Sequence, residues 1–190
     1  MPIDRQTFFE VMASFPSGVA VVTTTTDDGV PRGLTTTAVC SISADPPTVL
    51  VSVDLGSRTL AALRERGAFA VNFIGEGRSD LCLLFASKAP EKFSEVPWSP
   101  SDSGLPLLHE DALAWAECTT LQEVTVGDHV LLIALVEGGG VRPELEPPLL
   151  YYRRSWGVWS PMQEADEHEP VAIDAIEVSG RDLRWQGAEF

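Results

Sequence analysis

The sequence predicts a mainly β protein whose strands are antiparallel and close into a barrel. Most apolar stretches are short and β-branched, and they follow one another through hairpin turns. Helical periodicity is confined to a few short segments, whereas a doubly wound parallel sheet alternates strands with helices. With 190 residues, 44% of them hydrophobic, the chain is long enough for one domain with a substantial core.

The first segment is predicted to form a short amphipathic helix. Asp4 is a favourable N-cap, and apolar residues recur at helical spacing from Phe8 to Phe15. The proline and glycine that follow within three residues are typical of a helix end.

Seven segments carry the β-branched and aromatic composition of strands. Asp28-Gly29 gives the hairpin signal between the first two, and Gly127-Asp128 is the turn between the long pair. Gly138 to Gly140 is expected to end that ladder as a turn or bulge, because no helix follows it as in a phosphate loop. The predicted strands are 18–26, 30–42, 48–53, 69–74, 112–124, 130–138 and 149–152.

Two further short helices are expected between these strands. Ser57 is expected to cap a helix over 58–66, which Gly67 ends. Ser79 is expected to cap the second. The stretch 88–107 shows no period and is rich in proline, serine and charge, so it is predicted to be a long surface loop of the type that often carries function.

Charge and cysteine usage exclude several classes of function. A net charge of −15 and a pI near 4.4 disfavour nucleic acids and anionic membranes as partners. The first residues lack the pattern of a signal peptide, and no apolar run approaches the length of a membrane span. The three cysteines show no disulfide or zinc spacing, so we expect no metal site and a cytoplasmic location.

The composition changes near Pro161, so the chain is divided into a barrel domain, 1–160, and an acidic C-terminal extension, 161–190. The extension carries eight acidic residues and two arginines. It is either an arm docked on a neighbour or a partly disordered tail. Docking is favoured, because the segment is too apolar for a purely solvated tail, with Val171, Ile173, Ile176, Val178, Leu183 and Trp185.

The stretch 33–41 combines strand propensity with a dense row of hydroxyls. On its own, Thr35 to Thr37 also fits a surface strand whose hydroxyls face water. A segment that pairs on one edge and offers N–H and O–H groups elsewhere suits a flat, polar, aromatic ligand. The helix start near Ser57 then offers free N–H groups to an anion, which is compatible with capping.

Short motifs follow one another along the chain in a fixed order. They are 15–23, 27–29, 33–38, 41–47, 57–59, 69–72, 85–86, 92–93 and 127–129. Together they resemble the flavin reductase-like family of FMN-binding split barrels, over about residues 5–159. The resemblance implies a Greek-key split β-barrel that works as a homodimer. It also implies an NAD(P)H:flavin oxidoreductase that supplies reduced flavin to a partner monooxygenase.

The resemblance also implies site residues, and it places His129 beside the nicotinamide as the catalytic position. The strand along the isoalloxazine ring carries Thr35, Thr36, Thr37, Ala38, Cys40 and Ser41. The group around the flavin phosphates is Ser52, Ser57, Arg58 and Thr59. The loop that closes over the flavin is represented by Phe85, Ala86, Lys92 and Phe93. A terminal aromatic cluster is represented by Tyr152 and Trp156.

Several alternatives stay open at this stage. Cys40 stands where the family often has serine or threonine, and it is interpreted as a small filler rather than a nucleophile. Without the family, His129 is an ordinary hairpin residue and Arg58 a solvated cation. A flavin-carrying electron-transfer protein, an FMN-dependent oxidase of the pyridoxamine-phosphate type and a sensor module would share the barrel. The cofactor is FAD or FMN. No arginine cluster for a 2′-phosphate is evident, which favours NADH over NADPH.

Overall fold

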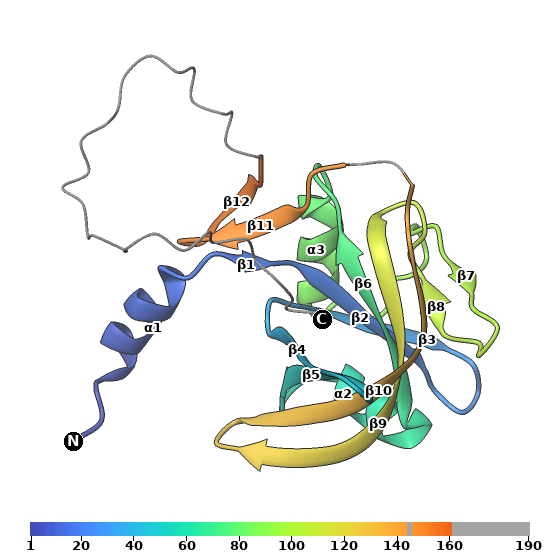
Figure 1. Ribbon diagram of the computed structural model, residues 1–190, viewed down its shortest axis with the longest axis horizontal. Coiled ribbons are helices and arrows are strands. Elements are labelled where there is room, and N and C mark those ends of the chain that lie inside the picture. The colour runs from blue at the N-terminus through green and yellow to red at the C-terminus, as the bar shows by residue number, and fades with distance from the viewer. Residues whose placement is uncertain (144–145, 161–190) are drawn as a thin grey trace, which may run out of the picture. The chain divides into compact units, whose positions relative to one another are not determined.

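The structure, a computed structural model, describes residues 1–143 and 146–160 (Figure 1). The predicted mainly β, antiparallel class is confirmed. The predicted extension 161–190 lies outside the described residues. In the part of the chain that the structure describes, no helix combines the length and the apolar character that crossing a membrane requires.

One seven-stranded antiparallel sheet forms the body, in the order β3-β2-β6-β9-β10-β5-β4. Its strands are β2 Ala20–Thr25, β3 Pro31–Thr36, β4 Val39–Ala44, β5 Pro47–Asp54, β6 Ala68–Ile74, β9 Ala112–Val126 and β10 His129–Val141. The smaller sheets contain β1 Ser17–Gly18, β11 Leu149–Tyr152 and β12 Ser155–Val158, and β7 Ser99–Pro100 with β8 Pro106–Leu107. The helices are α1 Arg5–Ala13, α2 Thr59–Arg66 and α3 Ser79–Ala86.

The single strand predicted over 30–42 is wrong, because the chain breaks at Thr37 and Ala38. β3 pairs with β2 at one edge of the sheet, and β4 pairs with β5 at the other edge. At the break, Thr36 Oγ1 accepts a hydrogen bond from Ala38 N (3.0 Å), and Ala38 O accepts one from Ser52 N (3.0 Å). Two residues thus connect opposite edges of one sheet. They span only a few ångströms per residue, so the sheet must curve until its edges approach here.

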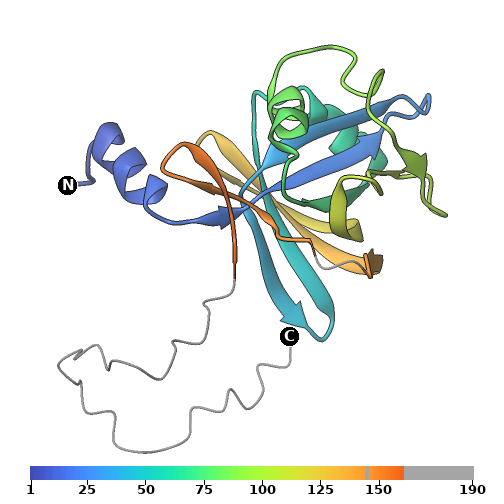
Figure 2. The same cartoon turned by 90° about the horizontal axis from the view of Figure 1, so that it is seen from above.

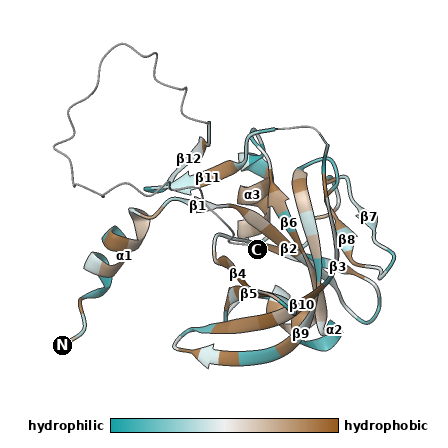
Figure 3. Cartoon of the chain, viewed as in Figure 1, coloured by the Kyte–Doolittle hydropathy of each residue, from teal (hydrophilic) through white to brown (hydrophobic). Residues whose placement is uncertain are grey.

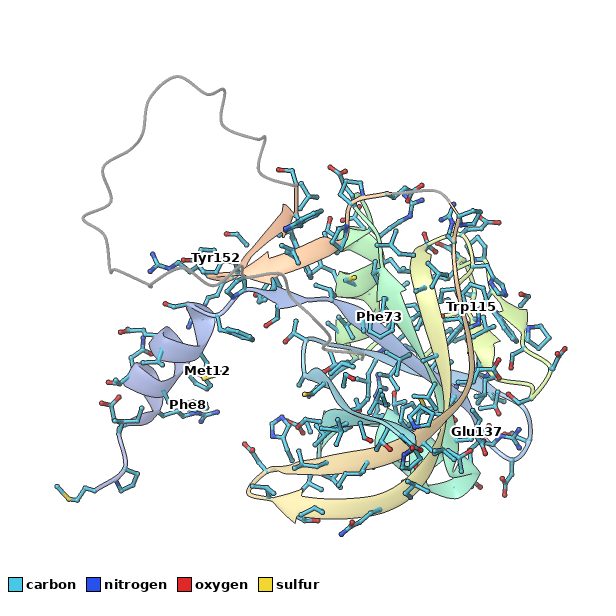
Figure 4. The ribbon with its side chains drawn as sticks, viewed as in Figure 1. Phe8, Met12, Phe73, Trp115, Glu137 and Tyr152 are labelled. Atoms are coloured by element: carbon cyan, nitrogen blue, oxygen red, sulfur yellow. The ribbon has the colours of Figure 1, made fainter. Side chains whose placement is uncertain are left out.

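The ladder between β9 and β10 runs on through the glycines, where the sequence predicted its end. β10 continues to Val141, and the expected bulge is a register shift between Val136 and Gly138. A Cβ on Gly140 would lie 2.4 Å from Trp115 Cζ2. Trp115, labelled in Figure 4, therefore requires a glycine at position 140 opposite it.

Buried apolar side chains of the sheet pack with those of α2 and α3 to form the core. Figure 3 colours stretches of the sheet strands as hydrophobic. Leu60 and Leu63 of α2 are buried as predicted, and Gly67 ends α2 with a φ of +65°. Ser57 Oγ accepts a hydrogen bond from Thr59 N (3.3 Å), but α2 begins one residue later than predicted. Phe85 of α3 is buried in the second cluster, which also contains Cys82.

A buried amide fastens the loop after β8 to the sheet. Asn72 Nδ2 donates to Val21 O (3.0 Å) and to Thr23 Oγ1 (3.1 Å), and Asn72 Oδ1 accepts from Leu108 N (3.0 Å). Each polar atom of the buried side chain is thus satisfied. Most of the predicted loop 88–107 remains irregular.

Helix α1 forms as predicted, with Asp4 Oδ1 accepting from Thr7 N (3.0 Å), but it covers no part of the core. It projects away from the sheet in both views (Figures 1 and 2). None of its residues is buried, and Phe8 and Met12 are 49% and 50% exposed. Figure 4 shows these side chains far from the sheet residue Trp115. The apolar side chains whose spacing predicted the helix, such as Phe8 and Met12, are therefore not buried by any other element of the described chain.

Candidate active site

A cleft lies where β3, β5 and the start of β10 meet the N-terminus of α2 and the C-terminus of α3. Its main cavity has a volume of about 570 Å³, and a second cavity of about 390 Å³ adjoins it. The two share Thr35, Thr36, Ser52, Ala86 and His129, so they form one elongated cleft. The second cavity is also lined by Thr37, Ala38 and Trp156, and we call it the ring end.

Most of the residues that the sequence assigned to the site come together in this cleft. They are Thr35, Thr36, Thr37, Ala38, Ser52, Ser57, Arg58, Thr59, Phe85, Ala86, Lys92, His129 and Trp156. The break between β3 and β4 brings them together, because it turns the threonine run towards β5 and α3.

Four assigned residues lie elsewhere. Cys40 and Ser41 are exposed on β4 and do not line the cleft. Phe93 lines a neighbouring cavity instead. Tyr152 is 44% exposed, whereas Tyr151 lines the ring end and packs on Trp156 at 4.9 Å between ring centroids. Adjacent strand residues face opposite sides, so a shift of one position changes the face.

Sequence reasoning missed several residues that line the cleft, among them Asp54, Lys88 and Tyr151. Lys88 begins the long loop, and a cation beside a predicted anion site was the available signal. Asp54 ends β5, and its Oδ1 accepts from Gly56 N (2.6 Å), which shapes the turn before α2. This contact depends on the turn geometry, for which the sequence carries no distinctive motif.

The cysteines take no part in the cleft as nucleophiles. Burial raises the pKa of the Cys82 and Cys118 thiols to about 12, which keeps them protonated and inert. Cys40 is free and exposed on β4. Because it is exposed, Cys40 fills no gap in the core, so its interpretation as a small filler is wrong, and the absence of a nucleophilic role stays a prediction.

The threonine hydroxyls position the strand as well as facing the cleft. Thr35 Oγ1 donates to Cys82 O at 2.7 Å, which ties β3 to α3. Thr36 Oγ1 accepts from Ala38 N at the strand break. The donor of Thr35 is therefore already used, and its oxygen keeps acceptor capacity towards a ligand.

Cations gather at the end of the cleft nearest α2. Lys92 Nζ donates to Phe85 O (2.5 Å) and Gly33 O (3.2 Å), and burial, with a smaller effect from Arg58, lowers the pKa of this lysine. Arg58 donates to the carbonyls of Lys88 and Ala89. Arg58, Lys88 and Lys92 thus line one cleft on a protein of net charge −15, and this local concentration of positive charge suits an anion.

Gly33 is the point where strand, helix and loop meet. Its carbonyl accepts from both Thr59 Oγ1 (3.0 Å) and Lys92 Nζ. A Cβ at Gly33 would lie 2.7 Å from Phe85 Cε1 and 3.1 Å from Val22 O. The glycine therefore allows Phe85 to pack on the strand while the carbonyl holds the two side chains at the anion end.

His129 is the first residue of β10 and lines both cavities of the cleft. It lies in register with Asp54 of β5, and its side chain is 44% exposed. Its Nδ1 lies 2.7 Å from Asp128 Oδ1, and this hydrogen bond lowers the pKa of the Asp128 carboxyl. When Nδ1–H donates to Asp128, Nε2 is the ring nitrogen available to a ligand. The neutral ring accepts there, and only the protonated ring donates.

Known proteins share both the sequence and the fold. A family described as "Flavin reductase like domain" matches residues 12–160. A flavin reductase (NADH) from Kitasatospora aureofaciens is 44% identical over 163 residues, 85% of each chain. A flavin reductase (NADPH) from Lentzea aerocolonigenes is 40% identical, over 80% of this chain and 88% of the relative. Reductase subunit HsaB of a Mycobacterium tuberculosis flavin-dependent monooxygenase is 33% identical, over 96% and 97%.

Solved structures agree with these relatives. The NADH:FAD oxidoreductase SgcE6 of Streptomyces globisporus, in complex with NAD and FAD fragments, has a TM-score of 0.78 at 29% identity, over 86% of this chain and 96% of that chain. The likenesses define the class of protein, a small antiparallel β protein whose named relatives are flavin reductases. The chain belongs to the flavin reductase like domain family.

Proposed function

We propose that this protein is an NAD(P)H-dependent flavin reductase that passes reduced flavin to a separate monooxygenase. The observation that carries the proposal is the elongated cleft, polar and aromatic at the ring end and cationic at the α2 end, in a chain of this family. Two relatives carry the names flavin reductase (NADH) and (NADPH), and a third is a reductase subunit of a monooxygenase. We favour NADH, because the first of these is 44% identical.

The residues of the cleft fit a flavin. The ring end is lined by Thr36, Ala38 and the indole of Trp156, a combination of polar and aromatic groups that suits a flat polar ring. Ser57, Arg58 and Lys92 line the main cavity at the start of α2 and would hold the phosphate there. The joined cavities of about 570 and 390 Å³ have the size of ordinary cofactor sites.

The protein's own part in the reaction is to bind and orient. When bound, the flavin supplies the ring that accepts a hydride from the reduced nicotinamide, so no protein acid or base is required at that transfer. The threonine strand fixes one edge of the site, and His129 positions the nicotinamide amide.

We further propose that the curved sheet is a split barrel and that two chains form the working unit. The two-residue link between β3 and β4 supports the barrel, because it brings the sheet edges together. The uncovered apolar face of α1 supports a homodimer. The cytoplasm remains the proposed location, since a reducing compartment suits three free cysteines.

Charging the face of α1 is expected to separate the two chains. The double variant Phe8→Glu/Met12→Glu places two carboxylates where an interface would exclude water, which is unfavourable for burial. Light scattering should give about twice the 20.6 kDa chain mass for the native protein and about that mass for the variant. Glu10→Gln on the same helix is the control and should stay dimeric. A native protein that is monomeric would refute the dimer proposal.

Steady-state oxidation of NADH under air, with FMN, FAD or no added flavin, tests the proposed function. Turnover should rise and saturate with added flavin, because an exchangeable flavin is a substrate. NADPH should be used less well than NADH.

Two other outcomes would point elsewhere. A yellow protein whose rate ignores added flavin would mean a resident prosthetic group, as in an electron carrier or an oxidase. An absence of NADH and NADPH oxidation with every flavin would reject the reductase proposal.

A further inference from the structure

A third cavity continues the cleft beyond the cationic end. It has a volume of about 310 Å³ and shares Arg58, Thr59 and Lys92 with the main cavity. Its other walls come from the start of β3 and from the long loop after α3. We call it the far cavity, and its remaining lining residues are Pro31, Arg32, Gly33, Ala89, Pro90 and Phe93.

The three cavities follow one another in a fixed order. The ring end shares residues with the main cavity, and the main cavity shares others with the far cavity. The ring end and the far cavity have no lining residue in common. A ligand that filled all three would therefore be long, with its anionic group in the middle, beside Arg58 and Lys92.

The far cavity has its own cation. Arg32 is half-buried, and among the described residues its guanidinium makes one hydrogen bond, to the backbone carbonyl of Pro31 at 3.2 Å. Its charge lowers the pKa of the Asp28 carboxyl, but it is the smallest of the effects on that group. Arg58, by contrast, is engaged with the carbonyls of Lys88 and Ala89. Arg32 is thus the guanidinium with donors to spare for a second anionic group.

The cavity also has an aromatic wall. Phe93 packs edge-on against Phe85 at 5.0 Å and against Trp98 at 5.9 Å between ring centroids, so its position is fixed from two sides. Aromatic faces and proline rings suit a nucleobase, and guanidinium groups suit a phosphate. The chemistry of the far cavity is therefore that of a nucleoside phosphate.

We infer that the far cavity binds the adenylate half of FAD, and that Arg32 makes this protein select FAD over FMN. The inference rests on the proposed function, because it extends the same flavin site. FMN ends at one phosphate and would leave the far cavity empty. FAD continues through a second phosphate to adenosine, and the second phosphate would reach Arg32.

Equilibrium binding of FAD and FMN, followed by quenching of flavin fluorescence, tests the inference without turnover. The native protein should bind FAD about tenfold more tightly than FMN. Arg32→Ala should weaken FAD binding about tenfold, the loss typical of one charge-assisted hydrogen bond, and should change FMN binding less than twofold. Arg64→Ala, which removes an exposed ion pair with Glu123, is the control and should change neither.

A second variant keeps the test decisive if Arg32→Ala folds poorly. Ala89→Phe fills the far cavity from its loop wall and should weaken FAD binding while FMN binding is retained. Equal losses for both flavins, or no loss for FAD in either variant, would overturn the inference. The proposed function would survive that result, because NADH oxidation with FMN does not depend on the far cavity.

Discussion

Replacing Gly33 with valine is expected to lower the free energy of unfolding by about 3 kcal/mol and to abolish flavin binding. The new Cβ would lie 2.7 Å from Phe85 Cε1, well inside contact distance. Phe85 is 1% exposed and packs on Phe93, so any movement of its ring would disturb the core and the wall of the main cavity. Val22 O, at 3.1 Å, blocks the strand from shifting the other way.

The loss of binding follows from the same contact. Displacing the Gly33 carbonyl removes the acceptor shared by Thr59 Oγ1 and Lys92 Nζ. Both side chains line the anion end of the cleft, so their positions would be lost together. The variant is thus expected to fail in binding even at temperatures where it remains folded.

Urea unfolding and flavin fluorescence quenching measure the two effects separately. Gly33→Ala should show the same pattern with a smaller loss of stability. Gly157→Ala is the matched control, because a Cβ there has no atom within 4 Å, and it should change stability by less than about 0.5 kcal/mol. A Gly33→Val protein with native stability would show that Phe85 relaxes freely, contrary to this account.

Replacing His129 with alanine is expected to lower kcat/KM for NADH about tenfold while leaving flavin affinity within twofold. The ring lines both cavities of the cleft. Its Nδ1 contact with Asp128 fixes the ring and directs Nε2 towards a ligand. A lost hydrogen bond to the nicotinamide amide costs roughly 1.5 kcal/mol, which corresponds to this factor.

Two further variants test whether the orientation of the His129 ring matters in addition to its presence. Asp128→Asn keeps the histidine but weakens its orientation, so it should give a smaller loss in kcat/KM. His109→Ala removes a histidine that packs on Trp115 outside the cleft and serves as the control. If His129→Ala left turnover and NADH affinity intact, the positioning role would be wrong.

Local patterns in the sequence predicted much of the framework. The Asp28-Gly29 turn joins β2 and β3, Gly67 ends α2, and Gly127-Asp128 separates β9 from β10. Each depends on neighbouring residues only, because a tight turn or a helix cap is determined within a few positions. The ordered motifs also predicted the family.

Other features depended on contacts between distant segments. The strand break at Thr37 carries ordinary β-branched residues, and it forms because β3 and β4 pair with different partners across the sheet. The ladder continues through the glycines of β10 because each pairs with a residue of β9, and Gly140 lies opposite Trp115, which leaves no room for a side chain. Tyr151 lines the cleft where the sequence predicted Tyr152, because the pairing of β11 with its neighbours determines which face of the strand each side chain occupies.

The sequence by itself determined the class of fold, the turns, the helix ends and the set of polar residues available for a flavin site. Only the tertiary structure decided which of these residues line the cleft and which lie outside it. It joined the threonine strand to Ser52 and His129, left Cys40 and Ser41 on an outer strand, and placed Arg32 beside the cationic end. The physical reason is that residue composition sets local propensity, whereas a curved sheet selects the side chains that meet across it.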